Sequence, residues 1–211
     1  MELLLHSIAL DWPILTPILF CSILVLAVAI TRISFYNDNK RDVVTFIQRL
    51  QKELLKDNLD GAQTLSEQLG GVIGEVAEEG VRILAEQKHD FARSFDISIN
   101  LAVRKLEKHL TILGTIGGVA PFLGLFGTVV RILYTFQDLA VQGNQSAAVA
   151  MGIGSALIAT AFGLGVAIIA VILFNSFQSI VKRYEDDFQL LKLLFLSFSS
   201  ADIKSTNKVS L

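Results

Sequence analysis

Three long apolar segments alternate with polar segments along the chain. The apolar segments are residues 14–30, 110–136 and 149–175, and they contain almost no charged side chains. About 20 apolar residues in a helix that rises about 1.5 Å per residue cross the roughly 30 Å hydrocarbon layer of a bilayer. The pattern therefore predicts three transmembrane helices, preceded by a short extracytoplasmic N-terminus over residues 1–13.

The polar segments repeat apolar side chains at helical spacing. Val43, Ile47, Leu50 and Leu54 illustrate this repeat within residues 31–109, where strand-like alternation is absent. Residues 176–198 keep the same periodicity, so we expect them to extend the third span as a helix. The predicted fold is an all-α membrane protein whose three transmembrane helices continue into a cytoplasmic helical bundle.

Glycine and polar residues mark the expected interruptions. Within the cytoplasmic region, helix breaks are expected at Asp57-Asn58, Gly61, Gly70-Gly71 and Gly74. Residues 137–148 are rich in Gln, Asn, Gly and Ser and predict a periplasmic loop. Residues 199–211 are polar and predict a disordered tail.

Basic residues indicate the orientation. Of the 18 Lys and Arg residues, 17 lie in residues 31–109 or after Asn175, and the exception is Arg131. The positive-inside rule places those regions in the cytoplasm and the 137–148 loop outside. Trp12-Pro13 opens the first span without a basic n-region or a small-residue cleavage site, so we expect a signal anchor with its N-terminus outside.

Two threonines fall at similar depth in the second and third spans. Thr128 lies 9 residues before the predicted loop and Thr160 lies 12 residues after it. At about 1.5 Å per residue, both lie roughly 14–18 Å below the loop, near the bilayer midplane. A polar lining of an ion pathway is one interpretation. A packing seam in which each hydroxyl bonds the carbonyl four residues earlier is the other.

Small residues share helix faces with both threonines. Glycine and alanine at such spacing let helix backbones approach closely in lipid. We expect a homo-oligomer whose subunits meet through these stripes. The helix-packing candidates are Gly117, Pro121, Gly124, Gly152, Ala156 and Gly163.

The sequence favours neither an enzyme nor a nucleic-acid-binding protein. It has no phosphate loop, no cluster of metal ligands and no basic tract, and no cofactor or metal is expected. The single cysteine, Cys21, lies in an apolar segment and is interpreted as a buried small side chain. No Asp, Glu or Lys occurs between Lys108 and Asp138, or between Asp138 and Lys182. Either this protein moves no ions, or a partner supplies the acid.

The two membrane motifs resemble those of a known family. Residues 120–128, Ala-Pro-Phe-Leu-Gly-Leu-Phe-Gly-Thr, resemble the second transmembrane helix of the ExbB/TolQ/MotA family. Residues 152–153 and 156–164 resemble its third, and residues 59–84 resemble its cytoplasmic region. The resemblance covers nearly the whole chain.

The resemblance implies a subunit of an ion-driven stator in the cytoplasmic (inner) membrane of a bacterium. Such proteins form a pentamer around the single transmembrane helices of an ExbD/TolR-type partner, whose membrane Asp carries the proton. They energise outer-membrane transport or envelope processes through a TonB/TolA-type protein. The resemblance makes Thr128 and Thr160 pore threonines. A MotA-like motility stator and a non-conducting membrane scaffold are the alternatives, and a neighbouring gene for a single-span partner with a membrane Asp would exclude the scaffold.

Two residues depart from the family pattern. ExbB-like and TolQ-like proteins commonly place Glu where this sequence has Ser155, one turn outward from Thr160 on the expected ion pathway. A small residue usually occupies the position of Arg131. Arg131 is expected roughly 9 Å inside the loop, either as a positive ring at the pore mouth or with its guanidinium extended to a neighbouring subunit or lipid headgroups.

Overall fold

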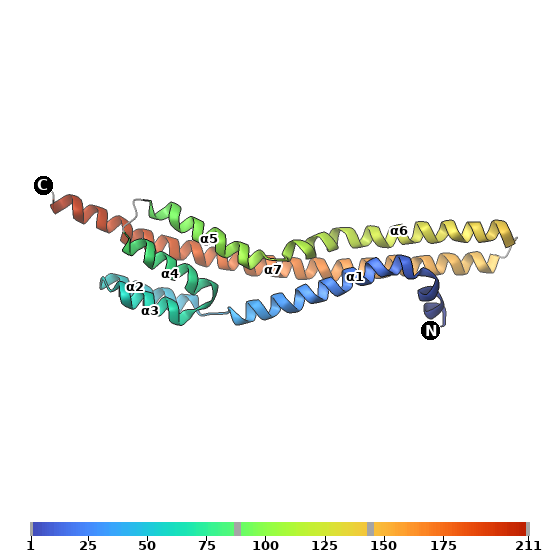
Figure 1. The fold of residues 1–211 in the computed structure, drawn as a ribbon, viewed down its shortest axis with the longest axis horizontal. Coiled ribbons are helices and arrows are strands. Elements are labelled where there is room, and N and C mark those ends of the chain that lie inside the picture. The colour runs from blue at the N-terminus through green and yellow to red at the C-terminus, as the bar shows by residue number, and fades with distance from the viewer. Residues whose placement is uncertain (1, 87–89, 143–145, 210–211) are drawn as a thin grey trace. The chain divides into compact units, whose positions relative to one another are not determined.

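The chain is all-helical in its regular structure. The computed structural model describes residues 2–86, 90–142 and 146–209, and no β-strand occurs in those ranges. This confirms the all-α prediction. The described residues form seven helices, shown in Figure 1: α1 (Glu2–Asp38), α2 (Val43–Leu55), α3 (Leu59–Leu69), α4 (Gly71–Ala85), α5 (Phe91–Glu107), α6 (Leu110–Gln142) and α7 (Ser146–Val209).

The chain divides into two compact units. Unit 1 comprises residues 1–32 and 109–177, which contain the first part of α1, α6 and the first part of α7. Unit 2 comprises residues 33–108 and 178–211, which contain α2 to α5 and the second part of α7.

Unit 1 has a surface suited to lipid. Three stretches of the described residues are long and apolar enough to cross a membrane: Leu15–Asp38, Leu110–Gln137 and Val149–Ser199. Large apolar side chains stay exposed on all three, including Phe20 on α1, Phe126 on α6 and Ile168 on α7. Exposed apolar surface on this scale is unfavourable in water and favourable in a bilayer. The protein is therefore a multi-pass membrane protein.

Unit 2 has an aromatic core between α5 and α7. Phe95 and Phe195 are fully buried, and their ring centroids lie 5.5 Å apart. Gly80 on α4 makes room for this pair, because a methyl group built on it would lie 2.4 Å from the Phe195 ring. At the edge of the core, the Lys192 ammonium lies 2.6 Å from the Asp96 carboxylate.

Short polar side chains begin three of the helices in unit 2. Asp42, Asn58 and Asp90 each accept a hydrogen bond from the backbone N–H three residues later, at the starts of α2, α3 and α5. Such caps satisfy amides that have no partner within the helix.

Two of the four predicted breaks are confirmed. Asp57 has φ of 57° between α2 and α3, and Gly70 and Gly71 have φ of 60° and 65° between α3 and α4. Gly61 and Gly74 lie inside helices, so those two predictions are wrong. A methyl group built on Gly74 would lie 2.7 Å from the Ser66 carbonyl oxygen, so this glycine allows α3 and α4 to pack closely.

The membrane helices extend beyond their predicted ends. α6 continues to Gln142, and α7 begins at Ser146 and continues to Val209. The 137–148 loop is therefore mostly helical, and residues 143–145 lie outside the described part. The tail predicted to be disordered is helical through Val209, because no Gly or Pro follows Gly165 to end the helix.

Candidate functional site

Four glycines allow close packing of α6 against α7 within unit 1. A methyl group built on Gly163 would lie 2.6 Å from the Ala120 carbonyl oxygen, and one on Gly124 would lie 2.9 Å from the Thr160 Cα. Methyl groups on Gly117 and Gly152 would meet side chains of the opposite helix, at 2.6 and 2.3 Å. The opposite backbone therefore leaves no room for a side chain at Gly124 and Gly163, whereas Gly117 and Gly152 make room for Val171 and Thr135 of the opposite helix.

This packing corrects the expected use of the small-residue stripes. The sequence predicted contacts between subunits at these stripes, but Gly117, Gly124, Gly152 and Gly163 contact the chain's own helices. Ala156 is also buried, and Pro121 is half-buried within α6. A sequence shows that a helix face is small, but not whether the helix packed against it belongs to the same chain.

The two threonines make different hydrogen bonds. The Thr160 hydroxyl donates to the Gly124 carbonyl oxygen on α6, at 3.0 Å. The Thr128 hydroxyl donates within α6 to the Leu125 carbonyl oxygen, at 2.6 Å, and its side chain is buried. In a regular helix the Gly124 carbonyl also accepts the Thr128 amide. The Gly124 carbonyl oxygen is therefore a shared acceptor for the Thr160 hydroxyl and the Thr128 amide, a role that the sequence did not indicate.

Arg131 and Ser155 contact each other across the same pair of helices. The Arg131 Nε donates to the Ser155 Oγ at 3.1 Å, and that hydroxyl donates to the Gly152 carbonyl oxygen at 3.0 Å. Thr135 lies beside them and donates to the Arg131 carbonyl oxygen. The residues that depart from the family pattern thus lie within one polar cluster. Arg131 contacts α7 of its own chain, which neither expected orientation included.

The site holds one formal charge. Between Lys108 and Asp138 the only charged side chain is Arg131, and the first part of α7 has none up to Lys182. Hydroxyl groups and carbonyl oxygens can solvate or relay an ion, but they do not take up a proton near neutral pH. The α6–α7 site can therefore line a path for a cation, but needs an acid from elsewhere to bind a proton.

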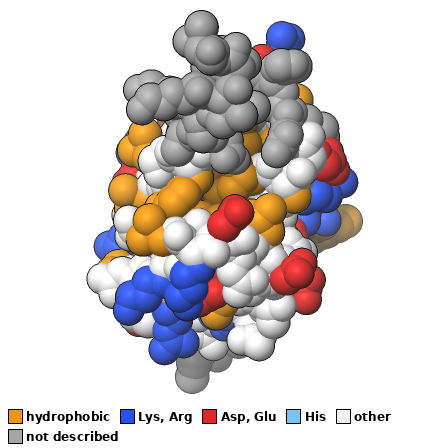
Figure 2. All heavy atoms as spheres, turned by 90° about the vertical axis from the view of Figure 1, so that its left-hand side faces the viewer, with side chains coloured by type: hydrophobic (Ala, Val, Ile, Leu, Met, Phe, Trp, Pro, Cys, Tyr) orange, Lys and Arg blue, Asp and Glu red, His pale blue; other side chains and the backbone are white. Residues whose placement is uncertain are grey.

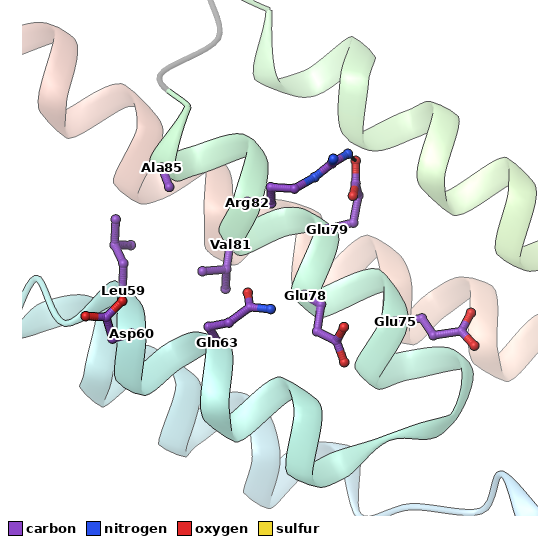
Figure 3. Close-up of a pocket in the computed structure, with 9 residues that line it drawn as sticks. All are labelled: Leu59, Asp60, Gln63, Glu75, Glu78, Glu79, Val81, Arg82 and Ala85. Carbon is purple, nitrogen blue, oxygen red and sulfur yellow. Dashed lines mark hydrogen bonds and ion pairs between the residues drawn. The ribbon is translucent and has the colours of Figure 1, made fainter.

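Unit 2 contains an open groove between α3 and α4 (Figure 3). Its volume is about 470 Å³, and four of its lining residues are acidic: Asp60, Glu75, Glu78 and Glu79. Glu78 and Gln63 point into the space between the helices, whereas Glu79 forms an ion pair with Arg82. The groove is a polar surface of unit 2 and is separate from the α6–α7 site in unit 1.

The electrostatics of this groove follow from burial and like charge. Desolvation raises the pKa of the Glu78 carboxyl above its usual range, and the carboxylates of Glu67 and Glu75 raise it further. Within the described residues no three His, Cys, Asp or Glu side chains converge as metal ligands do. This groove therefore does not match a metal centre.

Comparison with known proteins identifies relatives of this chain. A sequence profile of the MotA/TolQ/ExbB proton channel family matches residues 68–190, more than half of the chain. The chain is 44% identical over 108 residues to the Tol-Pal system protein TolQ of Pseudomonas aeruginosa. It is 45% identical over 83 residues to the biopolymer transport protein ExbB of Pseudomonas putida, and 49% identical over 74 residues to that of Neisseria gonorrhoeae.

These similarities cover part of each protein. The TolQ alignment spans 47% of this chain and 47% of TolQ. The ExbB alignments span 39% and 35% of this chain, and 25% and 34% of the two relatives. The chain thus matches about half the length of TolQ, and a quarter to a third of these ExbB proteins.

Proposed function

Because this chain belongs to the MotA/TolQ/ExbB proton channel family, we propose that it is the ExbB/TolQ-like subunit of an ion-motive-force stator. It acts in the inner membrane of a bacterium, with its N-terminus in the periplasm and its C-terminus in the cytoplasm. Together with an ExbD/TolR-type single-span partner it energises outer-membrane transport or another envelope process, through a TonB/TolA-type protein.

One observation carries this proposal: a hydroxyl group bridges α6 and α7 in spans that contain no carboxylate. The Thr160 hydroxyl bonds the Gly124 carbonyl oxygen, and Thr128 is buried one turn along α6 from that carbonyl. Both hydroxyls have a hydrogen-bond partner and are therefore tolerated in lipid, but helices that only packed through glycine would not require a hydroxyl at this depth on each of them. The arrangement supports an ion pathway whose acid comes from the partner's membrane Asp.

The residues of the pathway have separate roles in this proposal. Thr128 and Thr160 solvate the ion beside the partner's Asp. Ser155 lies about five residues, or roughly 7.5 Å, further outward along α7 and offers the next hydroxyl. The subunits form a pentamer around the partner helices, and the flow of protons past the Asp drives movement of one component relative to the other.

Arg131 marks the pore mouth in the same proposal. It lies one turn outward from Thr128, where a ring of subunits repeats its positive charge. Such a ring repels cations unless the partner brings negative or strongly hydrogen-bonding groups to that level. We therefore expect Arg131 to limit ion leak through the oligomer before the partner is bound.

The names of the relatives favour transport over motility. The relatives described above are Tol-Pal and biopolymer transport proteins. A MotA-like stator would share the membrane helices but act on a different load, and a scaffold would share only the packing. Ion flux measurements separate the scaffold from both stators.

The test removes one hydroxyl and keeps its shape. Thr160→Val, in the complex with its partner in liposomes, should lower proton flux by about tenfold or more, because the ion loses a solvating group at the midpoint of the path. Flux is read with a pH-sensitive dye under an imposed potential, and native mass spectrometry checks that the oligomer persists.

A matched control lies on α6. Thr115 is exposed and bonds the Thr111 carbonyl oxygen of its own helix, so Thr115→Val should leave the flux near that of the unmodified protein. Thr160→Ser should retain most of the flux. Equal flux in the Thr160→Val and Thr115→Val variants would remove Thr160 from the ion pathway.

A further inference from the structure

Unit 2 exposes two apolar pairs beyond the spans predicted from the sequence, residues 14–30, 110–136 and 149–175. On α5, Ile97 and Leu101 are 58% and 56% exposed, and on α7, Leu190 and Leu193 are 54% and 64% exposed. Each pair lies on adjacent turns of its helix, so it forms a ridge rather than scattered single residues. Figure 2 shows one face of the molecule, on which hydrophobic side chains also reach the surface between basic and acidic ones.

The two ridges lie on outward faces of their helices. α5 and α7 pack together through Phe95 and Phe195. Ile97 and Leu193 are each two residues from one of these phenylalanines, and two residues correspond to about 200° around a helix. Each ridge therefore points away from the contact between α5 and α7 within the chain, so neither can cover the other in the same chain.

The two ridges also lie at the same height along the bundle. α5 and α7 run antiparallel in unit 2 (Figure 1), and the Asp96–Lys192 ion pair fixes their register. Counting from that pair, Leu101 is level with about residue 187 and Leu190 with about residue 98, so the ridges coincide to within about one helical turn.

The α5 ridge borders a groove that fits a helix. The groove lies between α4 and α5, has a volume of about 490 Å³, and extends from the Glu75–Lys105 ion pair at one end to Arg82 and Ser94 at the other. These ends are about 11 residues apart along α5. On α7, Asp186, Leu190, Leu193 and Ser197 form an exposed ridge of the same length.

We propose that a second copy of this chain occupies the groove, with the α7 ridge of one subunit seated between α4 and α5 of the next. This inference rests on the homo-oligomer of the proposed function and adds its contact surface outside the membrane. Two different patches meet in such a contact, so it repeats from subunit to subunit. Because the patches lie at the same height to within about one helical turn, the repeat needs little shift along the axis, which favours a closed ring over a filament.

Charge supports a second copy as the occupant. When Leu190 lies opposite Leu101, Asp186 of one subunit lies within about one turn of Lys105 of the next. Lys105 is exposed and already forms an ion pair with Glu75 on one side. The docked Asp186 carboxylate completes a charged cluster at the groove end, while the leucines exclude water beside it.

Disulfide trapping tests this contact in the assembled protein. The only native cysteine, Cys21, is replaced by Ser, and Leu101→Cys and Leu190→Cys are introduced together into the full chain with its partner. Oxidation in membranes should give a ladder of covalent multimers on a non-reducing gel. Each single-cysteine variant should run as a monomer on this gel, because position 101 of one subunit faces position 190 of the next and not a second position 101.

Leu55 supplies the control. It is a 69% exposed leucine on α2, outside both ridges, so Leu55→Cys paired with Leu190→Cys should give no ladder. In a second measurement, Leu190→Asp should weaken oligomers extracted in detergent by about tenfold, whereas Leu55→Asp should not. Dimers from Leu101→Cys alone, an equal ladder from the Leu55 pair, or an intact oligomer without any ladder would each overturn the proposal.

The outcome is independent of ion conduction. If the ladder forms and Thr160→Val leaves the proton flux unchanged, the contact stands and the proposed ion pathway fails. If the flux depends on Thr160 but the intact oligomer gives no ladder, the stator proposal stands and the contact between α7 and the groove is wrong.

Discussion

Arg131 places a permanent positive charge in a span that has no other charged side chain between Lys108 and Asp138. Insertion of an arginine at the centre of a transmembrane helix costs about 2.5–3.5 kcal/mol, and polar partners reduce that cost. The Ser155 hydroxyl is one such partner, at 3.1 Å from Nε. The serine hydroxyl accepts from Nε but carries no formal charge, so this particular bond does not itself neutralise the guanidinium.

Arg131→Gln removes the positive charge but keeps a side chain that can hydrogen-bond to Ser155. This variant should increase proton leak through the partner-free oligomer in liposomes by several-fold, because a glutamine still bonds but no longer repels cations. The leak is measured as the decay of an imposed pH gradient. Affinity for the partner should fall in the same variant.

Ser155→Ala is the matched control for this experiment. It removes the acceptor, which is also a hydroxyl of the proposed pathway, but leaves the positive charge, so its leak should not rise as that of Arg131→Gln does. Equal leak in both variants would mean that the hydrogen bond, rather than the charge, limits the flow, and the pore-mouth role of Arg131 would be abandoned.

At the scale of elements, the contact between α6 and α7 depends on glycines that differ in their surroundings. A methyl group on Gly163 meets backbone atoms of α6, whereas one on Gly165, two residues later on α7, has no heavy atom outside its own helix turn within 4 Å. The two positions share a helix and a residue type. They differ in whether the opposite backbone is close, which makes them a direct test of the packing.

Gly163→Ala should therefore destabilise unit 1 by about 1–3 kcal/mol, because α6 and α7 must separate to admit the methyl group. Gly165→Ala should be neutral or stabilising by up to about 1 kcal/mol, since alanine favours a helix over glycine. Thermal unfolding in one detergent compares them. Similar unfolding temperatures for both variants would contradict the close contact at Gly163.

The elements were largely predictable from periodicity, whereas the contacts of small residues were not. Long apolar runs determined the three spans, and Asp57 and Gly70 marked true helix ends. Gly61 and Gly74 were misassigned, because a glycine signals either a break or a close approach and the sequence does not distinguish them. The depth of Thr160 in the membrane followed from its distance in residues to the predicted loop. Its hydrogen-bond acceptor, the Gly124 carbonyl oxygen, is a backbone group that no residue pattern identifies.

At the scale of the whole chain, two tyrosines join segments that are far apart in sequence. The Tyr36 hydroxyl donates to the Leu106 carbonyl oxygen at 2.8 Å, and the Tyr184 hydroxyl donates to the Asn39 carbonyl oxygen at 2.9 Å. Leu106 lies in the last turn of α5, where carbonyl groups have no partner within the helix. In unit 2, therefore, the ends of α1 and α5 and the middle of α7 are joined by side-chain-to-backbone bonds.

The Asn39 side chain adds two further hydrogen bonds to this junction. Its side-chain oxygen accepts the Val72 amide at the start of α4, and its side-chain nitrogen donates to the Phe35 carbonyl oxygen. The sequence predicts no helix break near residue 39, since no glycine or proline lies there. Bonds between residues 33 to 145 positions apart depend on the folded arrangement, and local patterns cannot reveal them.

Tyr184→Phe should loosen the junction without disturbing the core, because the ring stays and only the hydroxyl is lost. The half-buried Asn39 carbonyl then loses its tyrosine donor, which costs about 1–2 kcal/mol. Since the Asn39 side chain also holds the start of α4, the loss should reach beyond α7. Amide hydrogen exchange in α4 should accelerate by about tenfold, the effect of roughly 1.4 kcal/mol on local opening.

Tyr134→Phe, at an exposed tyrosine of α6 in unit 1, should leave the exchange of α4 unchanged. If both variants exchange alike in α4, Tyr184 packs only through its ring and the junction at Asn39 does not stabilise unit 2.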